Sequence, residues 1–288
     1  MTNVIENIFG KVFSEKNLKF FEKIILIAAT LGFIIHLILI LLNNNGYLDL
    51  SFFKDQLFVN PISAIYTPFS FILIYEAFLL IYFLPRSFTT AIAKQFEIMS
   101  LILIRKIFKD IPNVNLNDNW IENENNLQLI YDLSGVLIVF FLIYLFKKLR
   151  EQLPQLPVHQ NLSRFISYKK LISLFLVPTL SFLCVISFME WFNYAFLGIG
   201  TGANIDYLFF VDFFTILILV DVFILLVSFQ YTERYSQLIR NTGFIISTIL
   251  LRLSFSAEGL TSLLLLVSGI VFGLIILLIY NNMEKEYK

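Results

Sequence analysis

Long apolar runs constrain this chain more than any other feature. Six of them, each 19 to 23 residues long, cover residues 24–42, 62–84, 127–146, 171–189, 207–229 and 260–280. A helix needs roughly 20 apolar residues to cross a hydrocarbon core about 30 Å thick. Only 15% of the residues are charged, whereas a soluble domain has about a quarter. The sequence therefore predicts an all-α, polytopic integral membrane helix bundle whose surroundings are a lipid bilayer.

Two less apolar segments, 87–108 and 235–255, decide how many crossings there are. Lys and Arg accumulate in short cytoplasmic loops, so their distribution distinguishes the topologies. If both segments cross and the N-terminus is cytoplasmic, 15 of the 21 basic residues lie inside and 4 outside. If 87–108 only lies on the surface, this bias disappears. We expect eight transmembrane helices in the plasma (cytoplasmic or inner) membrane, with both termini in the cytoplasm.

The chain is expected to divide into four parts. Residues 1–23 form a cytoplasmic amphipathic segment, 24–146 a first four-helix unit, 147–170 a basic cytoplasmic linker and 171–288 a second four-helix unit. In the first part, Val4, Ile8 and Phe9 recur at helical spacing against Glu6 and Lys11. Such a helix either lies on the inner leaflet or packs onto the protein's own cytoplasmic loops.

The two units resemble each other in sequence. At an offset of 145, Glu76 aligns with Asp221, and at an offset of 147, Ser100 aligns with Ser247 and Arg105 with Arg252. Apolar matches carry little weight in such a chain, so the alignment depends on these polar positions. Four crossings per unit is an even number, which predicts a parallel four-plus-four repeat related by an axis along the membrane normal.

A layer of charged residues marks the expected ion or substrate pathway. Glu76 and Asp221 each lie 8 residues before the inner end of an apolar run, at a depth of about 12 Å. Lys94 and Glu97 lie at a similar depth, roughly 10 and 15 Å from the same face. One interpretation is an ion or proton site with Glu76 and Asp221 as paired acids and Lys94 as counter-charge. The other is a set of ion pairs that only holds helices together.

Four further charges are expected to be structural or gating residues: Arg105, Arg252, Asp212 and Glu258. Arg105 belongs to a polar stripe of 87–108 that must face water, protein or lipid headgroups. Arg252 is placed in the outer third of its helix, where it either pairs with Glu258, Glu190 or Asp212 or extends to the outer headgroups.

The function expected from these features is that of a channel or secondary transporter for an ion or small solute. The alternative is a non-transporting subunit or scaffold whose cytoplasmic loops dock a partner. No sequence motif of an enzyme is present, and a lone cysteine with two isolated histidines predicts no metal site or cofactor. A net charge of zero gives no reason to expect nucleic acid as a partner. A homo-oligomer or a membrane partner protein is compatible with the sequence.

Overall fold

The computed structural model describes residues 2–48, 58, 60–111, 114, 123–153, 162–193, 205–232, 234–257 and 259–286. Within these ranges the chain is helical, with no strands. The α-helices are α1 Thr2–Val12, α2 Glu15–Asn44, α3 Tyr66–Phe83, α4 Phe88–Asp110, α5 Glu124–Glu151, α6 Leu162–Phe192, α7 Ile205–Phe229, α8 Tyr235–Leu253 and α9 Gly259–Glu286. Short 3-10 helices at Pro61–Ile65 and Ser254–Ser256 precede α3 and follow α8.

Six of the helical segments are long and apolar enough to cross a membrane, which confirms the prediction of a multi-pass membrane protein at this level. They correspond to α2, α3, α5, α6, α7 and α9. Large apolar side chains are exposed on the outside of these helices, among them Leu137, Phe175 and Leu219. Apolar groups on the outside of a bundle are compatible with contact to lipid tails.

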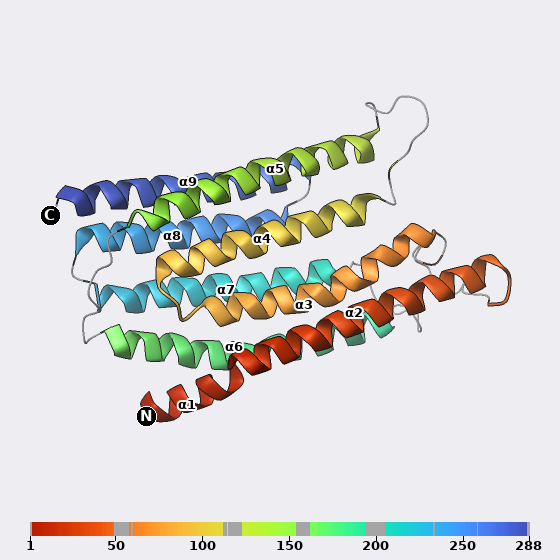
Figure 1. Ribbon diagram of the computed structural model, residues 1–288, viewed down its shortest axis with the longest axis horizontal. Helices are drawn as coiled ribbons and strands as arrows, with labels where there is room; N and C mark the ends of the chain where they lie inside the picture. The colour runs from red at the N-terminus through yellow and green to blue at the C-terminus, as the bar shows by residue number, and fades with distance from the viewer. Residues whose placement is uncertain are drawn as a thin grey trace.

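The long helices form two layers that follow one another in the chain. Helices α2 to α5 lie side by side in one layer, and α6 to α9 lie in the same order behind them (Figure 1). Successive helices run in opposite directions, so α1 and the C-terminal end of α9 lie at the same end of the bundle (Figure 1). Helix α4 contacts α8, and α5 contacts α9. A two-fold axis along the membrane normal, between the layers, would place α6 to α9 in the opposite order to α2 to α5. The two layers instead follow the same order, so the axis expected from the sequence does not describe this arrangement.

Local sequence explains several helix ends. Ser14 caps α2 by accepting a hydrogen bond from the backbone N–H of Asn17 at 3.2 Å, and Ser87 caps α4 through Thr90 at 3.3 Å. Gly46 adopts a φ of 75° just after α2, a conformation in which glycine has no Cβ to clash. These contacts fix the residues at which α2 and α4 begin and at which α2 ends.

Helices α4 and α8 occur where the two charged segments were expected, and they lie at the centre of the bundle. Most of their side chains are buried against other helices, so they need less apolar surface than a helix that faces lipid. Gly273 of α9 allows a close approach here, because a Cβ at this position would lie 2.8 Å from both Phe96 of α4 and Ser247 of α8. Small residues serve in this way wherever helices pack closely.

The ends of the predicted parts differ from the helix ends. Helix α2 already begins at Glu15, and both α5 and α6 extend into the segment expected as a linker. Lys147 and Lys148 therefore belong to the end of α5, and Lys169 and Lys170 to the beginning of α6. Residues 154–161 of that segment lie outside the described part of the chain.

The N-terminal helix packs onto the bundle with one apolar side and leaves the other exposed. Phe13 at its end contacts the ring of Phe78 in α3 at a centroid distance of 5.6 Å, and Glu6 forms an ion pair with Lys170 of α6 at 3.2 Å. On the other side, Val4, Ile8 and Val12 are exposed. Two arrangements were expected for this segment, packing onto the protein and lying on the inner leaflet. The contacts show packing onto the protein, and the exposed apolar side chains are compatible with contact to lipid as well.

Candidate functional site

A buried ion pair joins the two central helices of the second layer. Asp221 of α7 and Arg252 of α8 are 2% and 1% exposed, and Asp221 Oδ2 lies 2.7 Å from Arg252 Nη1. The Thr248 hydroxyl donates a hydrogen bond of 3.0 Å to the same carboxylate oxygen. Removing charges from water is costly, and a direct contact between opposite charges offsets part of that cost. Asp221 is therefore held by two groups of α8, one turn apart.

A small cavity opens beside Asp221 between the two layers. Its volume is about 20 Å³, and its walls come from α4, α6, α7 and α8, together with the end of α3. Four polar side chains reach it: Gln95, Lys169, Asp221 and Thr248. The rest of the wall is apolar. A space of this size holds one water molecule or an ion of similar size, and such an occupant needs two to four polar partners.

Lys169 supplies a second buried cation to this site. The residue is 3% exposed, and its Nζ donates a hydrogen bond of 2.6 Å to the backbone carbonyl of Arg86, in the turn between α3 and α4. The ammonium also lies 4.7 Å from the ring centroid of Phe88, within the range of a cation–π contact. It attracts Asp221 and is repelled by Arg240. Asp221 thus interacts electrostatically with two buried basic residues, in direct contact with Arg252 and at longer range with Lys169.

Gln95 of α4 is the neutral polar group of the cavity. It is buried, and its side-chain oxygen has no hydrogen-bond partner among the described residues. Leaving a buried acceptor unsatisfied costs about 1–3 kcal/mol. A hydrogen-bond donor such as water, bound in the cavity, would satisfy this oxygen.

The first layer also holds a buried acid and a buried arginine on neighbouring helices, Glu76 and Arg105. Glu76 is buried in α3, and the guanidinium of Arg105 in α4 interacts with its carboxylate electrostatically. Arg105 also donates a hydrogen bond of 3.4 Å to the backbone carbonyl of Phe69 in α3. Glu76 is not among the residues that line the cavity. Each layer therefore places an acid on one helix opposite an arginine on the next.

Lys94 and Glu97 belong to a different cluster. Lys94 Nζ and Lys147 Nζ lie 2.7 and 2.8 Å from the two oxygens of Glu97, and all three side chains are partly exposed. Two more contacts join the same helices, from Arg150 to Thr90 at 3.4 Å and from Lys106 to Asp132 at 3.7 Å. The polar stripe predicted on 87–108 is thus divided, because Glu97 and Thr90 contact α5 and Arg105 contacts α3. The cavity lies on the side of α4 that presents Gln95.

Among the described residues, the remaining sequence candidates do not line the cavity. Asp212 and Glu190 are exposed, and Glu258 lies outside the described residues. Arg252 is fully buried and pairs with Asp221, a partner that the sequence argument had assigned to a different depth. The sequence estimate treated each helix separately and took no account of which side chains of α7 and α8 face each other.

A polar cluster connects this region with the end of the bundle that holds α1. Arg240 lies 4.7 Å from the ring centroid of Tyr280 in α9 and donates to the side-chain oxygen of Asn241. Further toward that end, buried Glu284 accepts a hydrogen bond of 2.7 Å from Ser236 and pairs with Arg234 at 3.4 Å. Polar side chains therefore continue from the end of α9 to Lys169 and Asp221.

No family model, curated protein or solved structure matches this chain.

Proposed function

We propose that the protein is a channel or secondary transporter for a small ion or proton, which occupies the cavity between Asp221, Lys169, Gln95 and Thr248. The observation that carries this proposal is a cavity of about 20 Å³ between the two layers, which is largely apolar and is bordered by a buried acid and a buried lysine. Buried ionisable groups in membrane helices usually mark ion pathways or proton relays. The proposal assigns no enzymatic activity.

The size of the cavity favours an ion over a larger solute. About 20 Å³ accommodates one water molecule or a monatomic ion, and a solute of several heavy atoms does not fit this conformation. The transported species of the proposal is therefore narrowed from an ion or small solute to an ion or proton.

The local charge balance favours an anion or a proton over a cation. Two buried cations, Lys169 and Arg252, stand beside one buried carboxylate, Asp221. A bound monatomic anion would balance the surplus positive charge, and so would the loss of the Lys169 proton. A metal cation would increase the surplus. We expect Cl⁻ or H⁺ flux in preference to Na⁺ or K⁺.

The topology that we propose has eight crossings, with both termini in the cytoplasm of a plasma or inner membrane. Helices α4 and α8, with 23 and 19 residues, are about 34 and 28 Å long at 1.5 Å per residue, close to the thickness of a hydrocarbon core. They run alongside the six apolar helices (Figure 1), and their charges contact protein.

We also propose that the two layers are copies of one four-helix unit. Helices α2 and α6 begin 147 residues apart, and so do α4 and α8. The pair Glu76 and Arg105 corresponds to the pair Asp221 and Arg252. Each layer follows the same helix order, so the copies are related by a parallel displacement more closely than by a two-fold axis.

The alternative function is that of a membrane subunit or scaffold that does not transport. The contacts of Glu97 favour it, because this carboxylate is held by two lysines and joins α4 to α5 without reaching the cavity. In this case the charged layer only fixes helix packing, and the exposed basic ends of α5 and α6 dock a partner protein.

Flux measurements on purified protein in liposomes distinguish these functions. The transport proposal predicts that Asp221→Asn abolishes Cl⁻ or H⁺ flux, whereas the matched variant Asp212→Asn, which changes an exposed acid on the same helix, retains it. Because Asp221→Asn also breaks the pair with Arg252, Gln95→Leu is measured as well. This variant changes the cavity wall and leaves the ion pair intact. Absence of flux above empty liposomes in the wild-type protein would favour the scaffold.

A further inference from the structure

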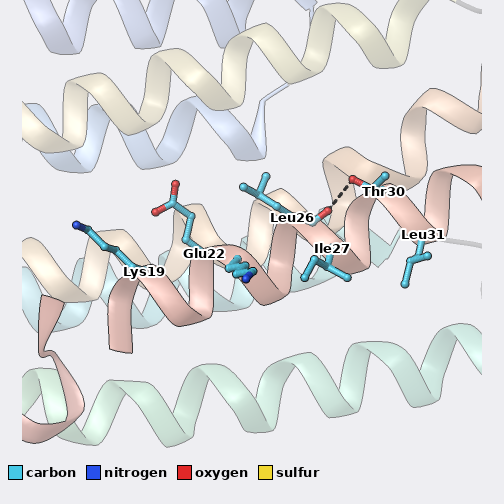
Figure 2. Close-up of a pocket in the computed structure, with 7 residues that line it drawn as sticks. Lys19, Glu22, Leu26, Ile27, Thr30 and Leu31 are labelled. Carbon is cyan, nitrogen blue, oxygen red and sulfur yellow. Dashed lines mark hydrogen bonds between the residues drawn. The ribbon is translucent and has the colours of Figure 1, made fainter. Parts of the chain in front are cut away.

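A groove runs along the outer flank of α2, separate from the cavity. It is shallow and open and is lined by α2 alone, with Lys19, Glu22 and Lys23 toward the start of the helix and Leu26, Ile27, Thr30 and Leu31 further along. Figure 2 shows Lys19 at one end of this row of side chains and Leu31 at the other. The groove therefore has a basic end and an apolar end.

The basic end carries positive charge that is open to the surroundings. Lys16, Lys19 and Lys23 follow one another at spacings of three and four residues and are exposed, so they share one face of α2. Glu22, which lies among them, hydrogen-bonds with the Tyr75 side chain of α3. Glu22 also lines the groove and is exposed, so the two lining lysines, Lys19 and Lys23, exceed the acid by one positive charge.

The whole groove, its basic end included, is about as long as half a hydrocarbon core. Leu26, Ile27 and Leu31 are each about half exposed. From Lys19 to Leu31 the helix rises about 18 Å at 1.5 Å per residue, and half of a hydrocarbon core is about 15 Å thick. A phosphate at the lysines would therefore place an acyl chain beside these three residues.

Helix α1 indicates the depth of the basic end. Its exposed residues Val4, Ile8 and Val12 lie one turn apart, and an apolar row on a short helix at the end of a bundle is typical of the lipid–water interface. Because α1 leads directly into α2 at Ser14, Lys16, Lys19 and Lys23 begin at the same level. In the proposed topology this is the cytoplasmic leaflet, where anionic lipids attract basic side chains.

We propose that this groove binds an anionic phospholipid of the inner leaflet, with the phosphate at Lys19 and Lys23 and an acyl chain along Leu26, Ile27 and Leu31. Charge complementarity selects an anionic over a zwitterionic lipid, and the apolar end selects a lipid over free phosphate. The inference does not depend on transport through the cavity.

Lipid titration followed by native mass spectrometry tests the proposal in detergent-purified full-length protein. The probes are phosphatidylglycerol and phosphatidylcholine with identical acyl chains. The variant is Lys19→Gln/Lys23→Gln, and the matched control is Lys148→Gln/Lys285→Gln, which removes two exposed lysines from the ends of α5 and α9. Thermal unfolding without added lipid shows whether the variants fold like the wild-type protein.

The wild-type protein is expected to prefer phosphatidylglycerol. Each lysine near an anionic surface contributes roughly a fivefold change in affinity, so the groove variant should bind phosphatidylglycerol about thirtyfold more weakly. Its affinity for phosphatidylcholine and the affinities of the control should change less than about threefold. Equal weakening by the control variant, no preference for phosphatidylglycerol, or displacement of the lipid by equimolar glycerol phosphate would each overturn the proposal.

Discussion

Replacing Arg252 by methionine tests how the charges at the centre of the bundle are held. Arg252 and Asp221 are almost fully buried, and their charged atoms are 2.7 Å apart. Arg252→Met leaves Asp221 with the Thr248 hydroxyl as its remaining hydrogen-bond donor among the described residues. Removing one member of a buried ion pair costs about 3–5 kcal/mol, because the other charge stays buried without its direct partner. We expect a loss of unfolding free energy in this range.

The double variant Asp221→Leu/Arg252→Met separates charge from packing. Replacing both members of a buried pair by apolar residues of similar size is often neutral, so the double variant should recover most of the stability lost in Arg252→Met. Unfolding is followed by circular dichroism during denaturant titration of the purified protein in mixed micelles. The single variant Asp221→Leu is measured as well. If Arg252→Met lowers the unfolding free energy by less than about 1 kcal/mol, or if the double variant lowers it by the sum of the two single variants, the two residues are not coupled as the structure describes.

Two other contacts give predictions of different size. Glu97→Gln should cost at most about 1 kcal/mol, since this carboxylate and its lysine partners are partly exposed; a loss above about 2 kcal/mol in the same titration would show that the cluster is more buried than described. Gly273→Leu should destabilise by about 1–3 kcal/mol or more, because its Cβ would meet Phe96 at 2.8 Å. The control Gly10→Leu, whose Cβ meets nothing within 4 Å, should change the unfolding midpoint little, and equal losses in both variants would contradict the packing argument.

The helices were largely predictable because their signal is local. An apolar run of about 20 residues specifies a long helix by itself, and α3, α5 and α9 lie where such runs occur. The charged segments 87–108 and 235–255 also correspond closely to α4 and α8. Their place at the centre of the bundle explains why they carry more charge than the helices around them.

The contacts of the site were less predictable because they depend on how helices face one another. Sequence depth grouped Lys94 and Glu97 with Asp221. In the structure Glu97 pairs with Lys94 and with Lys147 of α5, and Gln95 lines the cavity. Lys169 was counted as part of a basic linker. The sequence feature that indicated its burial is the spacing of four residues between Lys169 and Ser173, which places both on one face of a helix that continues into an apolar run.

The pairing of Asp221 with Arg252 was contained in the sequence but not read from it. The alignment of the two units placed Glu76 on Asp221 and Arg105 on Arg252. If the units pack alike, each acid must face the arginine of the next helix in its own unit. Depth along single helices instead suggested Glu258, Glu190 or Asp212 as partners, because it took no account of which helices are neighbours.

Ion flux through reconstituted protein tests the central claim most directly. Wild-type liposomes should carry Cl⁻ or H⁺, Asp212→Asn should retain this flux, and Asp221→Asn and Gln95→Leu should lose at least about nine-tenths of it, a change equivalent to about 1.4 kcal/mol. The account would be contradicted if flux persisted in both single variants, Gln95→Leu and Asp221→Asn, while both stayed folded. It would also be contradicted if the wild-type protein carried no ion above empty liposomes.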